Sequence, residues 1–138
     1  MTDNSAVIDG MNAHRPAVIH TLGGEVIALD LEAGLCTMQF QIDESLCHSG
    51  NVVQGGIITA MLDAAMSHAV FCQAPDVRSV ATLEIKTSFL APSLAGRFVC
   101  TGRIRKLAYK LAFMDGELFG DDGNLTATAT TTAKLQRK

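Results

Sequence analysis

The longest apolar stretch of the chain runs from residue 57 to residue 72, and its pattern predicts a helix. It consists mostly of Ile, Ala, Met, Leu, Val and Phe and contains no Pro or Gly, a composition that favours a helix. Because apolar residues lie on almost every side of this helix, we expect it to be buried centrally rather than to lie on a surface. Pro75 ends the helical segment.

Polar residues interrupt this helix at a regular interval. Thr59, Asp63 and Ser67 recur every four residues, so they share one narrow face, with Gly55 and Gly56 at its N-terminal end. A carboxylate in the middle of a buried helix costs on the order of several kcal/mol of desolvation unless a partner compensates for it. Asp63 is therefore either a structural carboxylate that bonds to the backbone or to its polar neighbours, or a functional group.

Shorter patterns precede the helix. Residues 1–14 indicate a mobile or loosely packed arm, and the segment after Pro16 indicates a short helix that is stopped by Gly23 and Gly24. Period-two alternation in residues 25–42 then predicts a hairpin with one face on the core. A loop connects this hairpin to the long helix.

After the helix, the chain reads almost entirely as strands. Alternation over residues 79–90 predicts a half-buried strand with Thr82 on its polar face. Residues 97–119 read as two further strands, and DDGN at 121–124 as a hairpin turn before a last, Thr-rich strand. One long helix with five or six antiparallel strands is an α+β domain, in which the sheet must wrap the helix to bury it.

Composition and charge exclude several classes of protein. With 138 residues, of which 48% are apolar and 18% charged, the chain predicts one soluble domain over 1–138. A net charge of -3, one Tyr and no Trp leave little for nucleic-acid binding. Asp63 and His68 argue against a membrane-spanning helix. The acidic N-terminus has no apolar core of a signal peptide.

The cysteines indicate a reduced environment rather than a metal site. The four of them are widely spaced, with no C-x-x-C pair and no Cys/His cluster at metal-ligand spacing. We therefore expect reduced core thiols in a cytoplasmic protein without a bound metal. They are Cys36, Cys47, Cys72 and Cys100.

The start of the long helix carries a recognisable motif. The stretch QGGIITAMLD closely resembles the helix-start signature of PaaI-like acyl-CoA thioesterases, with Gly55, Gly56 and Asp63 in register. TLEIKTSFLAP at 82–92 is similar to the third strand of that family. The resemblance covers roughly residues 20–135. It implies the hotdog fold, in which a five- to six-stranded antiparallel sheet wraps a long central helix.

The resemblance also implies catalytic roles. In such enzymes the backbone N–H of the first glycine polarises the thioester carbonyl, and the helix carboxylate is the general base or the nucleophile. These roles fall on Gly55 and Asp63. A polar side chain seven residues before the glycine, here His48, helps to position the reacting group. A Ser or Thr that assists with water corresponds to Thr82 or Ser67. The glycines alone are as consistent with a tight helix start.

Two positions depart from the family pattern. Gln54 stands where many members have His, and His48 stands where they have Asn or Gln. A histidine can be a donor, an acceptor or a cation, so the role of His48 stays open. Gln54, Gly56 and Asn51 are candidates for substrate binding, as is Ser67. No metal or redox cofactor is implied.

Two other groups of polar residues have ordinary explanations. Arg103, Arg105 and Lys106 form a small basic cluster, which fits a solvated strand edge or contact with coenzyme A phosphates. His68 on the long helix is interpreted as a core or interface residue rather than as a ligand.

The spacing of the two principal candidates predicts how the chain assembles. Gly55 and Asp63 are eight residues apart, which is about 12 Å along a helix, whereas both must reach one thioester carbon. Two antiparallel helices related by a two-fold axis would satisfy this requirement. We therefore expect an obligate homodimer, paired again into a tetramer as the resemblance implies. One subunit supplies Gly55, His48 and Gln54, and the other supplies Asp63, Ser67 and Thr82.

The favoured function is hydrolysis of an acyl-CoA thioester to a free acid and coenzyme A. A hotdog hydratase or dehydratase acting on acyl thioesters is an alternative, because it would use a catalytic His and His48 is available. The alternative from another class of protein is a non-catalytic acyl-CoA-binding domain. Such a domain would not require Asp63, so the presence of this residue favours catalysis.

Overall fold

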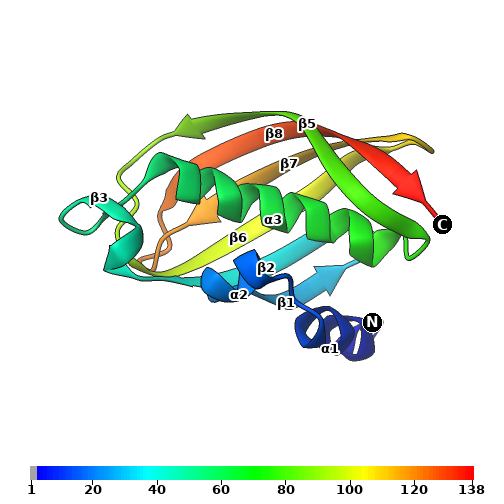
Figure 1. Ribbon diagram of the computed structural model, residues 1–138, viewed down its shortest axis with the longest axis horizontal. Helices are drawn as coiled ribbons and strands as arrows, with labels where there is room; N and C mark the ends of the chain where they lie inside the picture. Colours follow the sequence, from blue (N-terminus) through cyan, green and yellow to red (C-terminus); the bar gives the residue numbers. More distant parts are fainter. Residues whose placement is uncertain (1–2) are drawn as a thin grey trace.

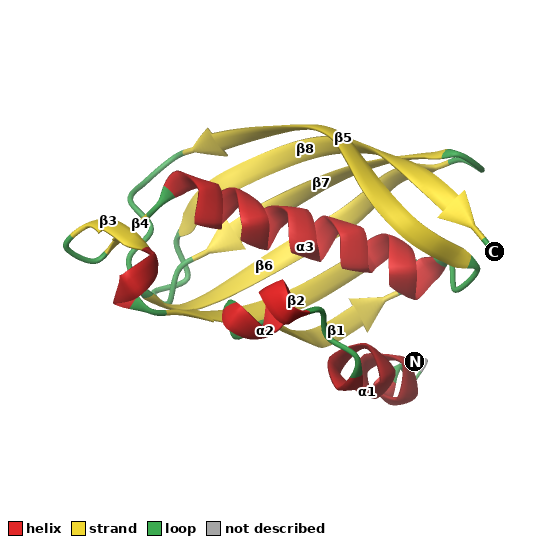
Figure 2. Ribbon diagram, viewed as in Figure 1, coloured by secondary structure: helices red, strands yellow, loops and turns green. Residues whose placement is uncertain are grey.

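One long helix on the face of an antiparallel sheet forms the frame of the computed structural model, which describes residues 3–138 (Figures 1 and 2). The helix is α3 (Gly55–Gln73), and the strand order is β1-β2-β6-β7-β8-β5. These elements confirm the predicted α+β class and the long central helix. The six strands are β1 (Glu25–Asp30), β2 (Leu35–Ile42), β5 (Val77–Phe89), β6 (Gly96–Leu107), β7 (Leu111–Phe119) and β8 (Leu125–Arg137).

Smaller elements surround this frame. The short helix expected after Pro16 is α2 (Ala17–Thr21). The predicted N-terminal arm contains helix α1 (Ser5–Ala13), none of whose residues is buried. The predicted loop before α3 contains a short 3-10 helix and a two-stranded sheet. These elements are η1 (Glu44–Leu46), β3 (Cys47–Ser49) and β4 (Val52–Val53).

Helix α1 covers one edge of the sheet through side-chain amides. Asn12 Oδ1 accepts a hydrogen bond of 2.8 Å from the Val26 N–H, and its Nδ2 donates one of 2.9 Å to the Val26 carbonyl. Asn4 Nδ2 donates to the Leu29 carbonyl at 3.0 Å. Three edge groups of β1, the N–H and carbonyl of Val26 and the carbonyl of Leu29, are thereby satisfied by side chains. At the other edge, β5 pairs with β8 alone within the described chain.

Strand β5 contains a bulge that corrects one prediction. Thr82 lies opposite Ala133 and Glu84 lies opposite Thr132, so Leu83 has no partner in the ladder. The extra residue shifts the alternation by one position. Thr82 therefore faces α3 and does not share the outer face with Glu84, as an unbroken alternation predicted. Leu83 is left 58% exposed.

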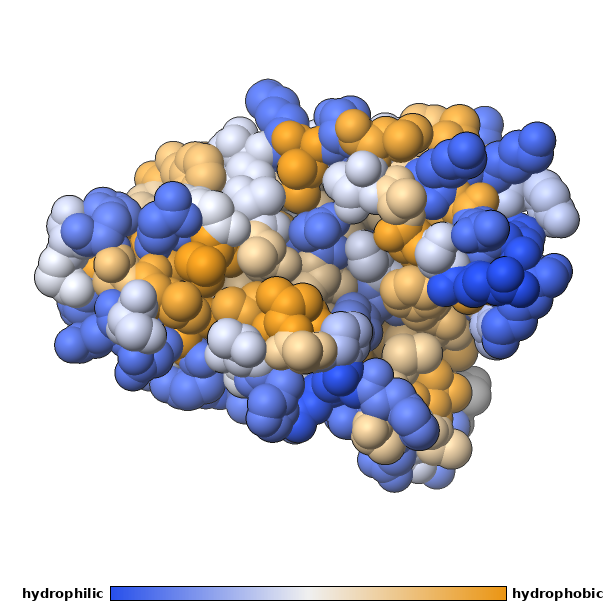
Figure 3. Space-filling model, in the orientation of Figure 1, coloured by the Kyte–Doolittle hydropathy of each residue, from blue (hydrophilic) through white to orange (hydrophobic). Residues whose placement is uncertain are grey.

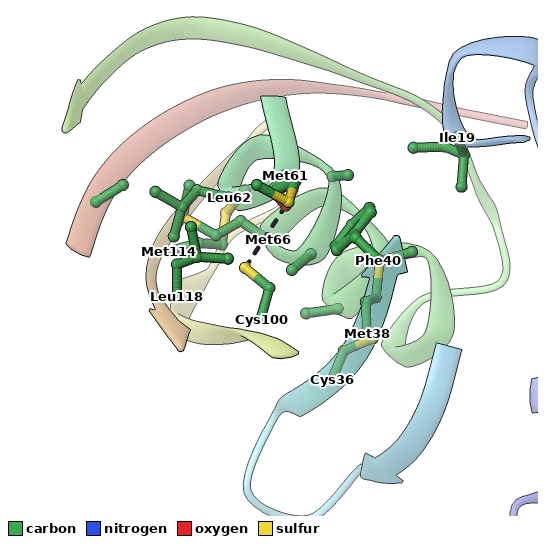
Figure 4. Packing of buried hydrophobic residues seen from close by; sticks show 14 of the residues in the cluster. Ile19, Cys36, Met38, Phe40, Met61, Leu62, Met66, Cys100, Met114 and Leu118 are labelled. Carbon is green, nitrogen blue, oxygen red and sulfur yellow. Dashed lines mark hydrogen bonds between the residues drawn. The ribbon is translucent and has the colours of Figure 1, made fainter. Parts of the chain in front are cut away.

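The core lies between α3 and the sheet. Ten side chains of α3 are buried, and the helix contacts β2, β5, β6, β7 and β8. Figure 4 shows Met61, Leu62 and Met66 of the helix packed against side chains of the strands. The Cys100 thiol donates to the Met61 carbonyl at 3.6 Å. These contacts confirm that the helix is buried by several strands.

The described part of the chain has one helix that is long and apolar enough to cross a membrane. It is α3, with 19 residues and a mean hydropathy of 1.4 over its best window. Because more than half of that window is buried inside the protein, the apolar side chains of α3 are accounted for by the core. The core helix of a globular domain commonly shows this pattern.

The close packing of α3 against the sheet depends on a glycine in β6. A Cβ at Gly102 would overlap the backbone of Ala65 and Met66. On the neighbouring strand, a Cβ at Gly116 would lie 2.9 Å from the Thr101 carbonyl oxygen and 3.3 Å from side-chain atoms of α3. A side chain at residue 102 would therefore push the helix away from the sheet, whereas one at residue 116 would press chiefly on the backbone of β6.

We expect Gly102→Ala to lower the free energy of unfolding by about 3 kcal/mol or more. The added Cβ would overlap the backbone of α3, which cannot move aside as easily as the end of a flexible side chain. Urea denaturation measures this change. Gly10→Ala in α1 is a matched control, since nothing lies within 4 Å of the added Cβ and alanine favours a helix by up to about 1 kcal/mol. Equal stability of the two variants would contradict the close-packing argument.

Candidate active site

The N-terminus of α3 leaves one backbone amide open. Gln54 is the N-cap residue, and its side-chain Oε1 accepts hydrogen bonds from the N–H groups of Gly56 at 2.6 Å and Ile57 at 3.3 Å. Among the residues that the structure describes, no acceptor faces the N–H of Gly55. This free donor lies at the positive end of the helix dipole, where it can stabilise negative charge.

A pocket of about 510 Å³ opens at this free amide. Its walls are mainly apolar, and they include His48, Val53, Gly55 and Ile58. Residues 89–93 also line the pocket. A Cβ at Gly55 would stand 3.4 Å from the ring of Phe89, so glycine allows a ligand to approach the backbone. Phe89 was not among the site residues predicted from the sequence, although it is the last residue of β5, the strand that carries part of the family resemblance.

Asp63 lies two turns further along α3 and is held by β5. The hydroxyl of Thr82 donates to Asp63 Oδ1 at 2.8 Å. One turn earlier on the helix, the hydroxyls of Thr59 and Thr87 are 2.9 Å apart. Thr59, Asp63 and Ser67 are all half-buried. The predicted polar stripe is confirmed, but it faces β5 and solvent rather than a closed apolar interior.

Within one chain, the two parts of the site are separate. Neither Asp63 nor Thr82 lines the pocket at Gly55. The eight-residue interval between Gly55 and Asp63 corresponds to about 12 Å along the helix axis. A carbonyl carbon bound at the Gly55 amide would therefore lie beyond the reach of the same chain's carboxylate.

The remaining candidates take different positions. The Gln54 oxygen and the Gly56 N–H bond to each other, and neither residue lines the pocket. Asn51 lines a separate cavity of about 320 Å³ together with Asp121 and Asp122. The structure thus brings His48 and Gly55 together, and Asp63 with Thr82, but leaves these three residues outside both groups.

Two histidines differ sharply in their surroundings. His48 is exposed, and its Nδ1 lies 2.7 Å from the hydroxyl oxygen of Ser49. His68 is buried, and its Nδ1–H donates to the Ala64 carbonyl at 2.8 Å. Burial lowers the pKa of His68, which favours the neutral ring. His68 thus belongs to the core, in agreement with its interpretation from the sequence.

The basic cluster lies away from the pocket at Gly55. Arg103 and Arg105 line a different hollow of about 370 Å³, which they share with Asp115 and Glu117. Arg105 forms an ion pair of 3.2 Å with Asp115. In the single chain, these cations are therefore matched by acidic side chains rather than directed toward the pocket.

The comparisons with known proteins agree with this geometry. Residues 50–127 match the family model described as the thioesterase superfamily. The chain belongs to the thioesterase superfamily. A relative in Saccharolobus solfataricus, named as an esterase, is 30% identical over 108 residues, which cover 78% of this chain and 71% of that protein.

Solved structures support the same assignment. A phenylacetic acid degradation-related protein from Ralstonia eutropha JMP134 shares 36% identity, with a TM-score of 0.85 over 94% of this chain and 97% of the other. The PaaI protein of E. coli, at 16% identity, has a TM-score of 0.82 over 96% and 94% of the two chains. These findings confirm the resemblance to PaaI-like thioesterases and the hotdog fold.

The hydroxyl pair between α3 and β5 can be tested by a double-mutant cycle. We expect Thr59→Val and Thr87→Val each to lower the free energy of unfolding by about 1 kcal/mol, because each leaves the other hydroxyl without its partner. The double variant should cost less than the sum, with a coupling of about 1 kcal/mol. Thr130→Val on the exposed face of β8 is the control. Strictly additive losses would contradict the pairing.

Proposed function

We propose that this member of the thioesterase superfamily hydrolyses acyl-CoA thioesters to a free acid and coenzyme A. The observation that carries the proposal is the open Gly55 amide in a pocket with apolar walls. Attack on a thioester turns its carbonyl oxygen into an oxyanion, which a helix N-terminal N–H stabilises. A pocket of about 510 Å³ lies within the usual size of small-molecule sites.

Asp63 supplies the second chemical group. Its carboxylate takes a proton from water as the water oxygen bonds to the carbonyl carbon, after which the C–S bond breaks and coenzyme A leaves as the thiolate. In a second route the carboxylate itself bonds to the carbonyl carbon, the C–S bond breaks and coenzyme A leaves as the thiolate, and water then cleaves the resulting anhydride to release the acid and the free carboxylate. Thr82 donates to Oδ1, which orients the carboxylate and leaves Oδ2 free to face the reacting atoms.

The site is proposed to be shared between two copies of the chain. The edge of β5 is unpaired in the described chain, and Leu83, Phe89 and Leu90 are each more than half exposed there. The molecular face that carries α3 also exposes apolar surface (orange in Figure 3). Two antiparallel copies of α3 would bring Gly55 beside Asp63 of the partner subunit. A further pairing into a tetramer is the assembly that the resemblance implies.

A hydratase is the second candidate, and the position of His48 favours it. This side chain lines the pocket together with Gly55, where it could add or remove a proton next to an acyl thioester. An assay with enoyl-CoA substrates separates hydration from hydrolysis. Hydration removes the absorbance of the conjugated double bond without releasing a thiol, whereas hydrolysis releases the thiol. Tight acyl-CoA binding without either reaction would identify a binding domain instead.

Replacing Asp63 tests the hydrolytic assignment. We expect Asp63→Asn to lower kcat by about 100-fold or more, because the amide can neither accept the proton nor attack the carbonyl. Thiol release from a panel of acyl-CoA substrates measures the rate, and sedimentation checks that the assembly is unchanged. Asp9→Asn on the exposed side of α1 is the control. Near-normal turnover by Asp63→Asn would end the assignment.

Mixing two inactive variants tests the shared site. Gly55→Pro removes the proposed N–H donor at a helix position that suits proline, and Gln54 before it is already extended, with φ -63° and ψ 137°. Co-refolding Gly55→Pro with Asp63→Asn should restore about a quarter of the wild-type sites, because half of the dimers are mixed and each has one intact site. If mixed dimers form and stay inactive, the site is not shared.

A further inference from the structure

The side chain of Gln54 folds over the start of α3 in an unusual cap. Short side chains such as Ser, Thr, Asp and Asn are preferred at this position, whereas Gln is one methylene longer than Asn. The carboxamide finds room because residue 56 is glycine, since a Cβ there would lie 2.8 Å from Gln54 Oε1. Gln54 and Gly56 are thus fitted to each other.

This cap has a selective effect on the first turn of α3. The side-chain oxygen of Gln54 occupies the N–H of Gly56 at 2.6 Å. The N–H of Ile57 lies 3.3 Å from the same oxygen and also donates to the backbone carbonyl of Gln54 at 2.9 Å. Within the part of the chain that the structure describes, the N–H of Gly55 is left without a protein acceptor. The cap therefore leaves one open donor at the start of the helix, rather than the two adjacent N–H groups of Gly55 and Gly56.

The cap is also electrically neutral. An Asp or Glu side chain would satisfy the same N–H groups and would interact favourably with the helix dipole. Its negative charge would, however, lie next to the amide at which an oxyanion develops during thioester attack, and the two like charges would repel each other. Gln54 completes the helix without weakening its attraction for an anion.

We propose that Gln54 and Gly56 form a positioning unit for the oxyanion donor, in which the carboxamide blocks the competing amide of Gly56 and keeps the remaining Gly55 N–H in an uncharged setting. The inference rests on the proposed thioester hydrolysis. Gln54 acts through Gly55 and is a positioning residue rather than a catalytic one.

Two substitutions at residue 54 separate helix capping from positioning. Gln54→Glu retains the acceptor but adds charge, so its melting temperature should equal or exceed that of the wild type, while kcat falls at least about 30-fold. Gln54→Met has a similar size but no acceptor, so we expect its melting temperature to fall by about 3 °C and its kcat by about five-fold. KM for the acyl-CoA should stay within about threefold in both.

Gly56→Ala tests whether the two residues act together. Its Cβ displaces the flexible carboxamide rather than the backbone, so we expect a loss of kcat similar to that of Gln54→Met. In the double variant Gln54→Met/Gly56→Ala, the loss of kcat should be no greater than in either single variant, because each substitution already removes the same cap. Multiplied losses would overturn the idea of a unit.

The outcomes separate this inference from the proposed function. A wild-type protein that hydrolyses no acyl-CoA in the panel refutes the hydrolytic function, and the inference with it. An active wild type with an equally active Gln54→Glu variant refutes the inference alone. Equal losses of kcat in Gln54→Glu and Gln54→Met would likewise show that charge beside Gly55 has no effect.

Discussion

The direct contact between the backbone of α3 and the strands beneath it is the constraint on which the rest of the structure depends. Gly102 removes the side chain that would otherwise stand between β6 and the Ala65 carbonyl. This contact sets the depth at which the helix lies. It thereby sets where the helix begins relative to Phe89 and where Asp63 meets β5. The pocket and the carboxylate owe their positions to the same packing.

A single inserted residue in β5 connects this frame to the chemistry. Without the bulge, Thr82 would lie on the outer face of the sheet beside Glu84 and Lys86. With it, the hydroxyl reaches Asp63, while Leu83 is turned out at the free edge. One irregularity thus orients the carboxylate and exposes Leu83 at the edge where the proposed dimer would form.

The sequence was sufficient for the long helix and the strands of the large sheet, because these depend on local spacing, but not for α1, η1, β3 and β4. Apolar residues on every side predicted the core helix, and alternation predicted the hairpin and the later strands. The same alternation misplaced Thr82, because a bulge leaves no mark in a strand whose residues suit either face. Pairings between distant residues, such as Asn12 with Val26 and Thr59 with Thr87, depend on tertiary packing and carry no local signal. Whether the candidate residues act as the resemblance implies is decided by chemistry rather than by pattern.

The two edges of the sheet differ, because within residues 3–138 β1 is partly covered by side chains and β5 is not, and this difference limits how copies of the chain can associate. The amide of Asn12 occupies the edge N–H and carbonyl of Val26 on β1, so another backbone cannot pair at this residue while α1 stays in place. The edge of β5 is open in the described part of the chain, and two copies that paired there would each occupy the open edge of the other. In such a pair both open β5 edges would be used, so the geometry favours a closed pair over an indefinitely extended ribbon.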